Sequence, residues 1–249
     1  MKAGLIIRLV VLAALVTLIV WPQGFEWLFA PMTKYGQPAI YTQNSLLNLT
    51  LSHLGIVAVA TFAATLVAVG LAILVTRPVG AEFLPLSRSL ANTGQTFPPV
   101  AVLALAVPVL GFGTAPTLVA LFLYGLLPIF ENALTGLTSL PPAVSDAARG
   151  SGMTNRQRLM GVELPLAAPV ILAGIRLSVV ISLGTATIGS TVAASTLGEV
   201  IIAGLLTSNT AFVAQGGLIV AAIAVLLYDG LSALERFLMR RTGQRGRGR

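Results

Sequence analysis

The sequence predicts an all-α, polytopic membrane protein, and three observations point to that fold class. The chain of 249 residues is 56% hydrophobic and only 9% charged, whereas about 25% of the residues in a soluble domain are charged. Apolar runs of about twenty residues recur along the chain, and this is the length that a bilayer-spanning helix requires. No segment shows the alternating ten-residue pattern of an outer-membrane barrel strand. We therefore expect about six transmembrane helices.

The first of these helices is expected at the start of the chain. Lys2 and Arg8 accompany an apolar run over residues 9–20, which is how a signal peptide begins. No small-x-small cleavage site follows, since residues 21–24 read Trp-Pro-Gln-Gly, so we expect an uncleaved helix. This helix and the polar loop after it form a predicted N-terminal part, residues 1–44, whose loop is periplasmic.

The remaining apolar runs account for the other predicted spans. The long runs lie at residues 49–75, 117–140, 166–192 and 212–234. A shorter run at 97–110 contains Pro98, Pro99 and Pro108, so it must be kinked or must borrow residues from 89–96. Irregular backbone at membrane depth needs cover from protein or from a water-filled cavity, which makes this run a candidate pathway wall.

The connections between the runs are charged or short. Residues 76–96 are expected to form a charged loop, and the apolar piece at 200–206 is too short to cross a bilayer. The tail, residues 236–249, contains six arginines and is expected to be disordered near anionic headgroups. The predicted transmembrane domain is therefore residues 45–235.

The distribution of basic residues predicts the orientation of the chain. Thirteen of the 15 lysines and arginines lie in the N-terminal tail, the 76–96 loop, the 141–165 loop and the C-terminal tail. The positive-inside rule then places both termini and the 141–165 loop in the cytoplasm. The same rule accounts for the formal charge of +7, so we expect no nucleic-acid partner.

Residues 141–165 form the longest connection that carries charges of both signs. They are expected to form two short helices, because Thr154 and Gln157 fit a capping box that opens the second one. The candidate start and stop residues of the first helix are Pro142 or Ser145 and Gly150 or Gly152. A connection with its own secondary structure is usually functional, so we interpret this one as a docking surface for a partner.

Glu131 and Arg176 are charged residues that fall inside predicted spans. Both lie roughly 13 to 15 Å from the same membrane face at 1.5 Å per helical residue. Intramembrane charges are costly unless they are paired or hydrated, so we hypothesise that the two pair or line one hydrated cavity. The alternative is that each side chain snorkels to a different wet surface. Small polar residues of the 166–192 run, including Thr185 and Thr187, suit close helix packing or a polar pore wall.

Catalytic and metal-binding patterns are absent from the sequence. Neither lysine follows a glycine, so no P-loop exists. The single histidine, His53, has no second histidine or cysteine beside it, and we expect a structural or interfacial role rather than a metal ligand. The chain also contains no cysteine, which excludes a disulfide framework and a cysteine nucleophile. We therefore expect no enzyme activity, cofactor or metal in this chain on its own.

The 141–165 loop resembles the cytoplasmic EAA loop of permease subunits in bacterial ABC importers. That motif reads Glu-Ala-Ala, three residues, Gly, nine residues, then Ile-x-Leu-Pro. At the same spacing this chain has Asp146-Ala147-Ala148, Gly152 and Val162-Glu163-Leu164-Pro165. The resemblance implies that the loop sits in a cleft of an ATPase subunit. The residues to which it assigns ATPase coupling are Asp146, Ala147, Ala148, Gly152, Leu164 and Pro165.

The resemblance extends over residues 45–235 and narrows to the osmoprotectant branch, which imports glycine betaine, choline or carnitine. The segments that carry it are residues 92–98, 120–129 and 184–188. Glu131 departs from the pattern, because a basic residue is expected there.

The resemblance implies a type I ABC importer permease fold in the bacterial inner membrane and alternating access. The implied partners are cytoplasmic ATP-binding subunits, a second permease chain that is identical or related, and a periplasmic or lipid-anchored solute-binding protein. The pathway residues that we predict are Glu131, Arg176, Thr185 and Thr187. The alternatives are a permease for another small solute such as an amino acid, an ion-coupled secondary transporter or channel, and a membrane scaffold.

Overall fold

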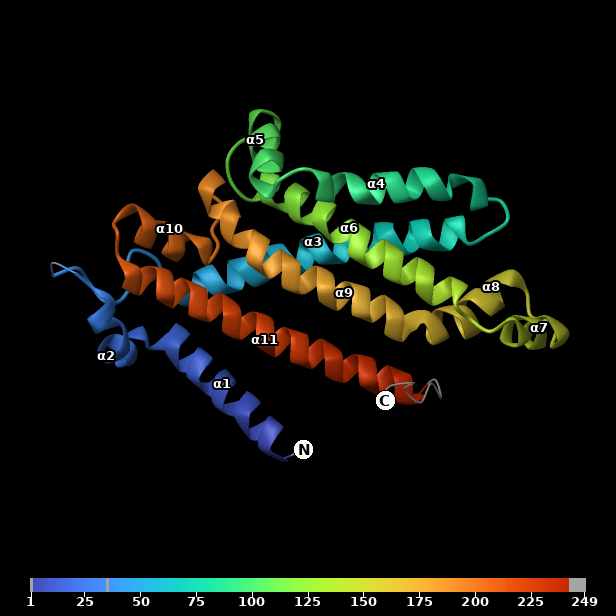
Figure 1. The fold of residues 1–249 in the computed structure, drawn as a ribbon, viewed down its shortest axis with the longest axis horizontal. Helices are drawn as coiled ribbons and strands as arrows, with labels where there is room; N and C mark the ends of the chain where they lie inside the picture. The colour runs from blue at the N-terminus through green and yellow to red at the C-terminus, as the bar shows by residue number, and fades with distance from the viewer. Residues whose placement is uncertain (1, 35, 242–249) are drawn as a thin grey trace. The chain divides into compact units, whose positions relative to one another are not determined.

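The computed structural model describes residues 2–34 and 36–241, and the fold within these ranges is all-α, as the sequence predicted (Figure 1). The α-helices are α1 (Lys2–Val20), α2 (Glu26–Phe29), α3 (Leu46–Val75), α4 (Leu84–Thr96), α5 (Pro99–Leu110), α6 (Thr114–Thr138), α7 (Pro142–Gly150), α8 (Asn155–Arg158), α9 (Leu164–Ala186), α10 (Gly198–Leu206) and α11 (Thr210–Arg241). Short 3-10 turns and one π-helical turn connect several of them.

The described residues contain between four and six candidate membrane spans. Four helical runs are long and apolar enough to cross a bilayer: Leu46–Val75, Thr114–Thr138, Asn155–Val192 and Thr210–Arg241. Two bent pairs, Ile6–Val20 with Pro22–Met32 and Ala81–Thr96 with Pro99–Leu110, each pass the same test as a broken span. The predicted number of about six agrees with the count in which each bent pair is one span.

The proline-containing run is bent, as its sequence predicted. The helices on either side of Pro98 meet at 96°. Because a proline disfavours α-helical torsion in the residue before it, the consecutive Pro98 and Pro99 stop α4 and restart the chain as α5. The interpretation of residues 76–96 as a loop is wrong from Leu84 onwards, since that part is α4. Its many small polar residues hid the helix, but side chains such as Thr93 bond back to the helix backbone.

The tail prediction also requires a correction. α11 continues as a helix to Arg241, so the first residues of the basic tail are ordered. Glutamate, leucine, methionine and arginine are good helix formers, and none of the residues from 235 to 241 is a glycine or proline that would end the helix. Arg241 stacks 4.6 Å over the ring of Phe237. The predicted disorder of residues 242–249 lies outside the described residues.

The chain divides into two compact units, and the long helices contribute residues to both. One unit contains residues 1–60, 97–121 and 180–228. In its interior Tyr41 packs edge-on against Phe212, with ring centroids 5.4 Å apart, and the Tyr41 amide donates to Gln215 Oε1 at 3.0 Å. The loop before α3 is therefore fixed to α11 by both ring packing and a hydrogen bond.

The second unit contains residues 61–96, 122–179 and the chain from 229 onwards, and it carries the 141–165 segment. Ala64, Ala68 and Ala72 recur every fourth residue on one face of α3 and are fully buried. Small side chains let membrane helices approach closely, and this alanine stripe belongs to one core with Phe130 of α6 and Ala167 of α9. The packed ends of these helices form the base from which the 141–165 segment projects.

Candidate functional site

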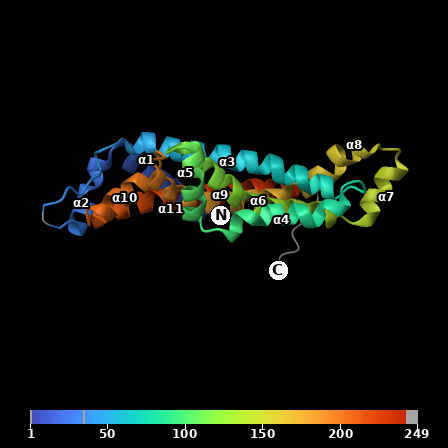
Figure 2. The same ribbon diagram turned by 90° about the horizontal axis from the view of Figure 1, so that it is seen from above.

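The 141–165 segment folds into the two short helices that the sequence predicted. Pro141 is extended, with φ −57° and ψ 133°, and Pro142 is the first residue of α7. Proline is well suited to that position because its φ is already helical and the first-turn N–H has no intrahelical acceptor. Figure 2 shows α7 and α8 next to one another in the second unit.

The end of α7 has the hydrogen bonds of a Schellman motif. The amide of Gly152 donates to the Arg149 carbonyl at 2.9 Å, and the amide of Met153 donates to the Ala148 carbonyl at 3.2 Å. This geometry requires a left-handed residue after the helix, and Gly152 has φ +75°. The glycine of the EAA-like motif is therefore the residue that reverses the chain direction between α7 and α8.

The start of α8 is a capping box, as predicted. Thr154 Oγ1 accepts the amide N–H of Gln157 at 3.3 Å, and Gln157 Oε1 accepts the amide N–H of Thr154 at 2.9 Å. Two amides that the first helical turn would leave without acceptors are satisfied in this way.

A single π-helical turn, η4 (Leu159–Glu163), joins α8 to α9. Pro165 lies just beyond it and lacks the N–H that a regular α-helix would direct to the carbonyl of Gly161. Such wide turns recur at functional sites in helices. In this chain the turn sets the position of Glu163 at the base of the segment.

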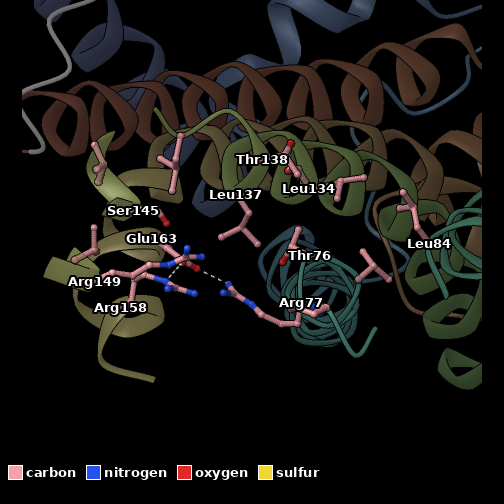
Figure 3. Close-up of a pocket in the computed structure, with 15 residues that line it drawn as sticks. Thr76, Arg77, Leu84, Leu134, Leu137, Thr138, Ser145, Arg149, Arg158 and Glu163 are labelled. Carbon is pink, nitrogen blue, oxygen red and sulfur yellow. Dashed lines mark hydrogen bonds and ion pairs between the residues drawn. The ribbon is translucent and has the colours of Figure 1, made fainter. Parts of the chain in front are cut away.

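Glu163 is the centre of a three-residue ion cluster (Figure 3). It accepts hydrogen bonds from Arg77 Nη2, just beyond the end of α3, and from Arg158 Nε of α8 at 2.8 Å. Its side chain is 12% exposed, and those of Arg77 and Arg158 are 24% and 11% exposed. Charge-assisted bonds in a largely buried site are strong, so this cluster ties the 141–165 segment to the end of α3. The sequence marked these three residues only as loop charges.

The outer surface of the segment is partly apolar. Among the motif residues, Ala148 is buried against the protein, whereas Asp146 and Ala147 are exposed. Met153 and Met160 are 40% and 61% exposed, and they line a shallow hollow of about 550 Å³. Methionines adapt their shape to a partner surface, so this hollow is suited to docking. Leu164 and Pro165 lie where the chain enters α9.

Glu131 and Arg176 do not pair with each other, so the predicted pair is wrong, whereas the alternative that both line one hydrated cavity stays a prediction. Glu131 forms a bidentate pair with Arg88 of α4, with distances of 2.6 and 3.1 Å. Arg176 donates to Glu235 Oε2 at 2.6 Å and to Ser232 Oγ at 2.8 Å. Equal depth in the membrane gives no information about helix rotation, and here rotation directs the two side chains to different neighbours.

The two threonines predicted for the pathway use their hydroxyls within their own helical turns. Thr185 Oγ1 donates to the Ile181 carbonyl at 3.0 Å, and Thr187 Oγ1 donates to the Gly184 carbonyl at 2.7 Å. His53 is fully buried, with Nε2 3.2 Å from the Leu183 carbonyl and Nδ1 3.4 Å from the amide nitrogen of Leu197. Both ring nitrogens contact backbone, so His53 has a structural role.

The loop before α3 carries a second polar cluster that sequence reasoning missed. Tyr41 Oη donates to Glu199 Oε1 at 2.7 Å, and Asn44 Nδ2 lies 3.4 Å from the same oxygen. Burial, reinforced by the hydrogen bond to Glu199, raises the pKa of the Tyr41 phenol, which therefore keeps its proton. Asn209 Nδ2 also donates to the Pro38 carbonyl at 2.9 Å, so the loop is fixed at several points.

The geometry of the Gly152 turn gives a testable prediction. Gly152→Ala should increase the amide exchange rate in α7 about fivefold, because a non-glycine residue in the left-handed region costs roughly 1 kcal/mol. A Cβ at this position meets no atom within 4 Å, so the cost is conformational and not steric. Hydrogen exchange measured by mass spectrometry would detect it. Gly150→Ala is the matched control: it has equal space but lies in the helix, and exchange there should stay unchanged or slow down. Equal acceleration in both variants would contradict the assignment.

Comparison with known proteins shows extensive similarity. Residues 68–243 match the family described as the inner membrane component of binding-protein-dependent transport systems. The osmoprotectant import permease protein OsmY of Salmonella typhimurium is 39% identical over 218 residues, which cover 88% of each chain. The choline transport system permease protein OpuBB of Bacillus subtilis is 38% identical over 78% of this chain and 88% of its own length. A third relative, the glycine betaine/carnitine/choline transport system permease protein OpuCB of Bacillus subtilis, is 35% identical over 69% of this chain and 82% of its own.

Solved structures share the fold at lower sequence identity. The MetNI methionine ABC transporter in an inward-facing conformation matches with a TM-score of 0.68 at 20% identity, over 78% of this chain and 95% of that one. An amino acid ABC transporter matches with a TM-score of 0.60 at 19% identity, over 78% of this chain and 92% of that one. At these identities the likeness concerns the fold alone, and it agrees with the type I importer architecture that the sequence predicted.

Proposed function

Since the chain belongs to the family of inner membrane components of binding-protein-dependent transport systems, and is a multi-pass permease subunit of an ABC importer, we propose that it imports an osmoprotectant. The solute class would be glycine betaine, choline, carnitine or a related compound. Relatives whose names state these solutes align with most of this chain, and they support the proposal.

We propose that the 141–165 segment is the cytoplasmic coupling loop on which a separate ATP-binding subunit docks. The observation that carries this proposal is the Glu163 cluster, because it fastens the segment to the end of α3 while the outer face stays exposed. Movement of a docked subunit would then be transmitted to the membrane helices rather than lost in a flexible loop. ATP hydrolysis belongs to that subunit in this proposal, since the chain has no Gly-Lys-Ser/Thr sequence.

The rest of the proposed assembly follows from the family. A second permease chain would complete the pathway, and a solute-binding protein would deliver the solute on the opposite face of the membrane. Both termini would be cytoplasmic, which agrees with the distribution of basic residues. The division into an N-terminal part at 1–44, a transmembrane domain at 45–235 and a tail at 236–249 is part of this proposal.

Co-purification tests the docking surface. Asp146→Lys should remove the ATPase subunit from the purified complex, because it reverses an exposed charge on α7. Gly152→Trp should also remove the ATPase subunit, because tryptophan disfavours the left-handed backbone of Gly152 at the turn after α7. Glu82→Lys makes the same charge change at an exposed carboxylate outside the segment, and the ATPase should stay bound in that variant. Retention of the ATPase by Asp146→Lys and Gly152→Trp would overturn the assignment.

We propose that Glu131 lines the solute pathway together with Arg88. The side chains of this pair are 37% and 51% exposed although Glu131 lies within a candidate span. Exposed charges at membrane depth face water or protein and not lipid, which supports a hydrated pathway on this face of α4 and α6. Arg176, Thr185 and Thr187 stay in the proposal as further pathway residues.

Cysteine accessibility tests the pathway face, because the chain has no native cysteine. In membrane vesicles, Glu131→Cys and Arg88→Cys should react with a charged, water-soluble thiol reagent. Phe62→Cys and Leu66→Cys are controls on apolar positions of α3 that are 66% and 60% exposed, and they should stay unlabelled in lipid. The pathway assignment fails if position 131 is as unreactive as the two controls in vesicles that hold equal amounts of protein.

A further inference from the structure

We propose that an arginine-lined cavity beside the 141–165 segment binds the phosphate group of an anionic phospholipid. Two cavities, of about 520 and 680 Å³, share Arg77, Arg149 and Arg158 among their lining residues, and together they form the proposed site. Both volumes fall in the range of roughly 300–1,000 Å³ that is usual for ligand pockets. This inference goes beyond the proposed transport function, which needs no lipid ligand.

The charged residues that line the cavity of about 520 Å³ do not balance one another. Three arginines face a single glutamate, Glu163, which leaves an excess of two positive charges. Glu163 is already shared between Arg77 and Arg158. Arg149 is exposed and has no ion-pair partner among the residues that the structure describes. The Nε atom of Arg77 is buried and has no hydrogen-bond acceptor among these described residues. Guanidinium groups bind phosphate oxygens through paired hydrogen bonds, so an anionic phosphate would neutralise this excess positive charge.

The apolar part of the cavity favours a lipid over a soluble phosphate. Val75, Leu134 and Leu137 line the smaller cavity near the ends of α3 and α6. Both helices are candidate spans, so in this proposal we place their ends at the level of the lipid headgroups. Directly after α3, Val79 is 88% exposed and Phe83 is 52% exposed. Large apolar side chains next to a basic cluster are typical of a surface that contacts an anionic membrane interface.

The proposed lipid site differs from the proposed docking hollow. The hollow around Met153 and Met160 includes no arginine among its lining residues. Arg149 and Arg158 of the segment line the same cavity as Arg77, which follows α3, and Figure 3 shows these three side chains around Glu163. A lipid bound there would bridge the base of α3 and the coupling segment without occupying the docking face.

Native mass spectrometry of the purified complex tests the proposal. The complex is reconstituted with phosphatidylglycerol or phosphatidylcholine, and the lipid that stays bound after detergent exchange is counted. The wild type should retain phosphatidylglycerol and not phosphatidylcholine. Arg149→Gln should lower the affinity for phosphatidylglycerol roughly fivefold, which corresponds to about 1 kcal/mol for one arginine at a membrane surface. Because Arg149 has no described partner to lose, this variant should fold normally.

Arg156→Gln is the matched control, since Arg156 is exposed in the same segment and lines neither cavity. It should retain phosphatidylglycerol like the wild type. Equal affinities in Arg149→Gln and the wild type would overturn the site. Equal retention of phosphatidylcholine would overturn the charge argument. If millimolar glycerol phosphate, which has no acyl chains, displaces the lipid, the result would contradict a phospholipid ligand and would indicate a soluble phosphate.

Discussion

Solute uptake should fall at least about tenfold when Glu163 is replaced by glutamine. The change leaves Arg77 and Arg158 close together in a mostly buried site without the carboxylate that neutralises them. Removal of one partner from a buried, hydrogen-bonded ion pair costs about 3 kcal/mol. We expect the cost to appear as local opening of the 141–165 segment, so that ATPase movement no longer reaches the membrane helices. Uptake in proteoliposomes and hydrogen exchange of the segment are the two measurements.

The controls separate this local effect from a general one. Glu82→Gln removes an exposed carboxylate from the connection after α3, and uptake should stay near the wild-type rate. In the double variant Arg158→Gln/Glu163→Gln, the 141–165 segment should lose less stability than the sum of the losses in the two single variants, because the two residues act as one contact. Strictly additive losses, or unchanged exchange in Glu163→Gln, would show that the cluster does not hold the segment.

The second large effect is expected at Glu235, whose carboxylate pairs with Arg176. The two side chains are only 14% and 21% exposed within candidate spans. Glu235→Leu removes the carboxylate that accepts the 2.6 Å hydrogen bond from Arg176 Nη1, and we expect a loss of about 3 kcal/mol in stability. The unfolding midpoint of the purified protein in detergent measures it. Ser232→Ala removes a neutral acceptor of the same guanidinium and should cost about 1 kcal/mol.

A compensating variant tests whether the pair is the cause. Arg176→Met/Glu235→Leu replaces both charges with apolar side chains of similar size, and such replacements are often neutral or stabilising. The double variant should recover most of the stability that Glu235→Leu loses. If the double variant is less stable than Glu235→Leu alone, the ion pair does not explain the effect.

The local features of the 141–165 segment were predictable because each depends on neighbouring residues. The proline at the start of α7, the left-handed Gly152 and the capping box of Thr154 and Gln157 act over four residues or fewer. Composition and run length similarly predicted the fold class and the approximate number of spans.

The partners of the charged residues were not predictable by the same reasoning. Arg77 meets Glu163 across 86 positions of sequence, and Arg88 meets Glu131 across 43. Such contacts depend on how each helix rotates about its axis, and the apolar pattern of a membrane helix specifies rotation poorly because lipid and protein interior are both apolar. For the same reason the depth of Glu131 and Arg176 suggested a pair that does not exist. Likewise, the sequence did not indicate which face of α3 packs against α6, and the structure shows that it is the face of Ala64, Ala68 and Ala72.

We propose that this chain transports solute only when a separate ATPase drives it through the 141–165 segment. The direct test is solute uptake into liposomes that contain either the purified chain alone or the chain with its ATP-binding subunits, binding protein and ATP. We predict no uptake by the chain alone under any imposed sodium or proton gradient, and ATP-dependent uptake by the complete assembly. Accumulation of solute by the chain alone under an ion gradient would contradict the account.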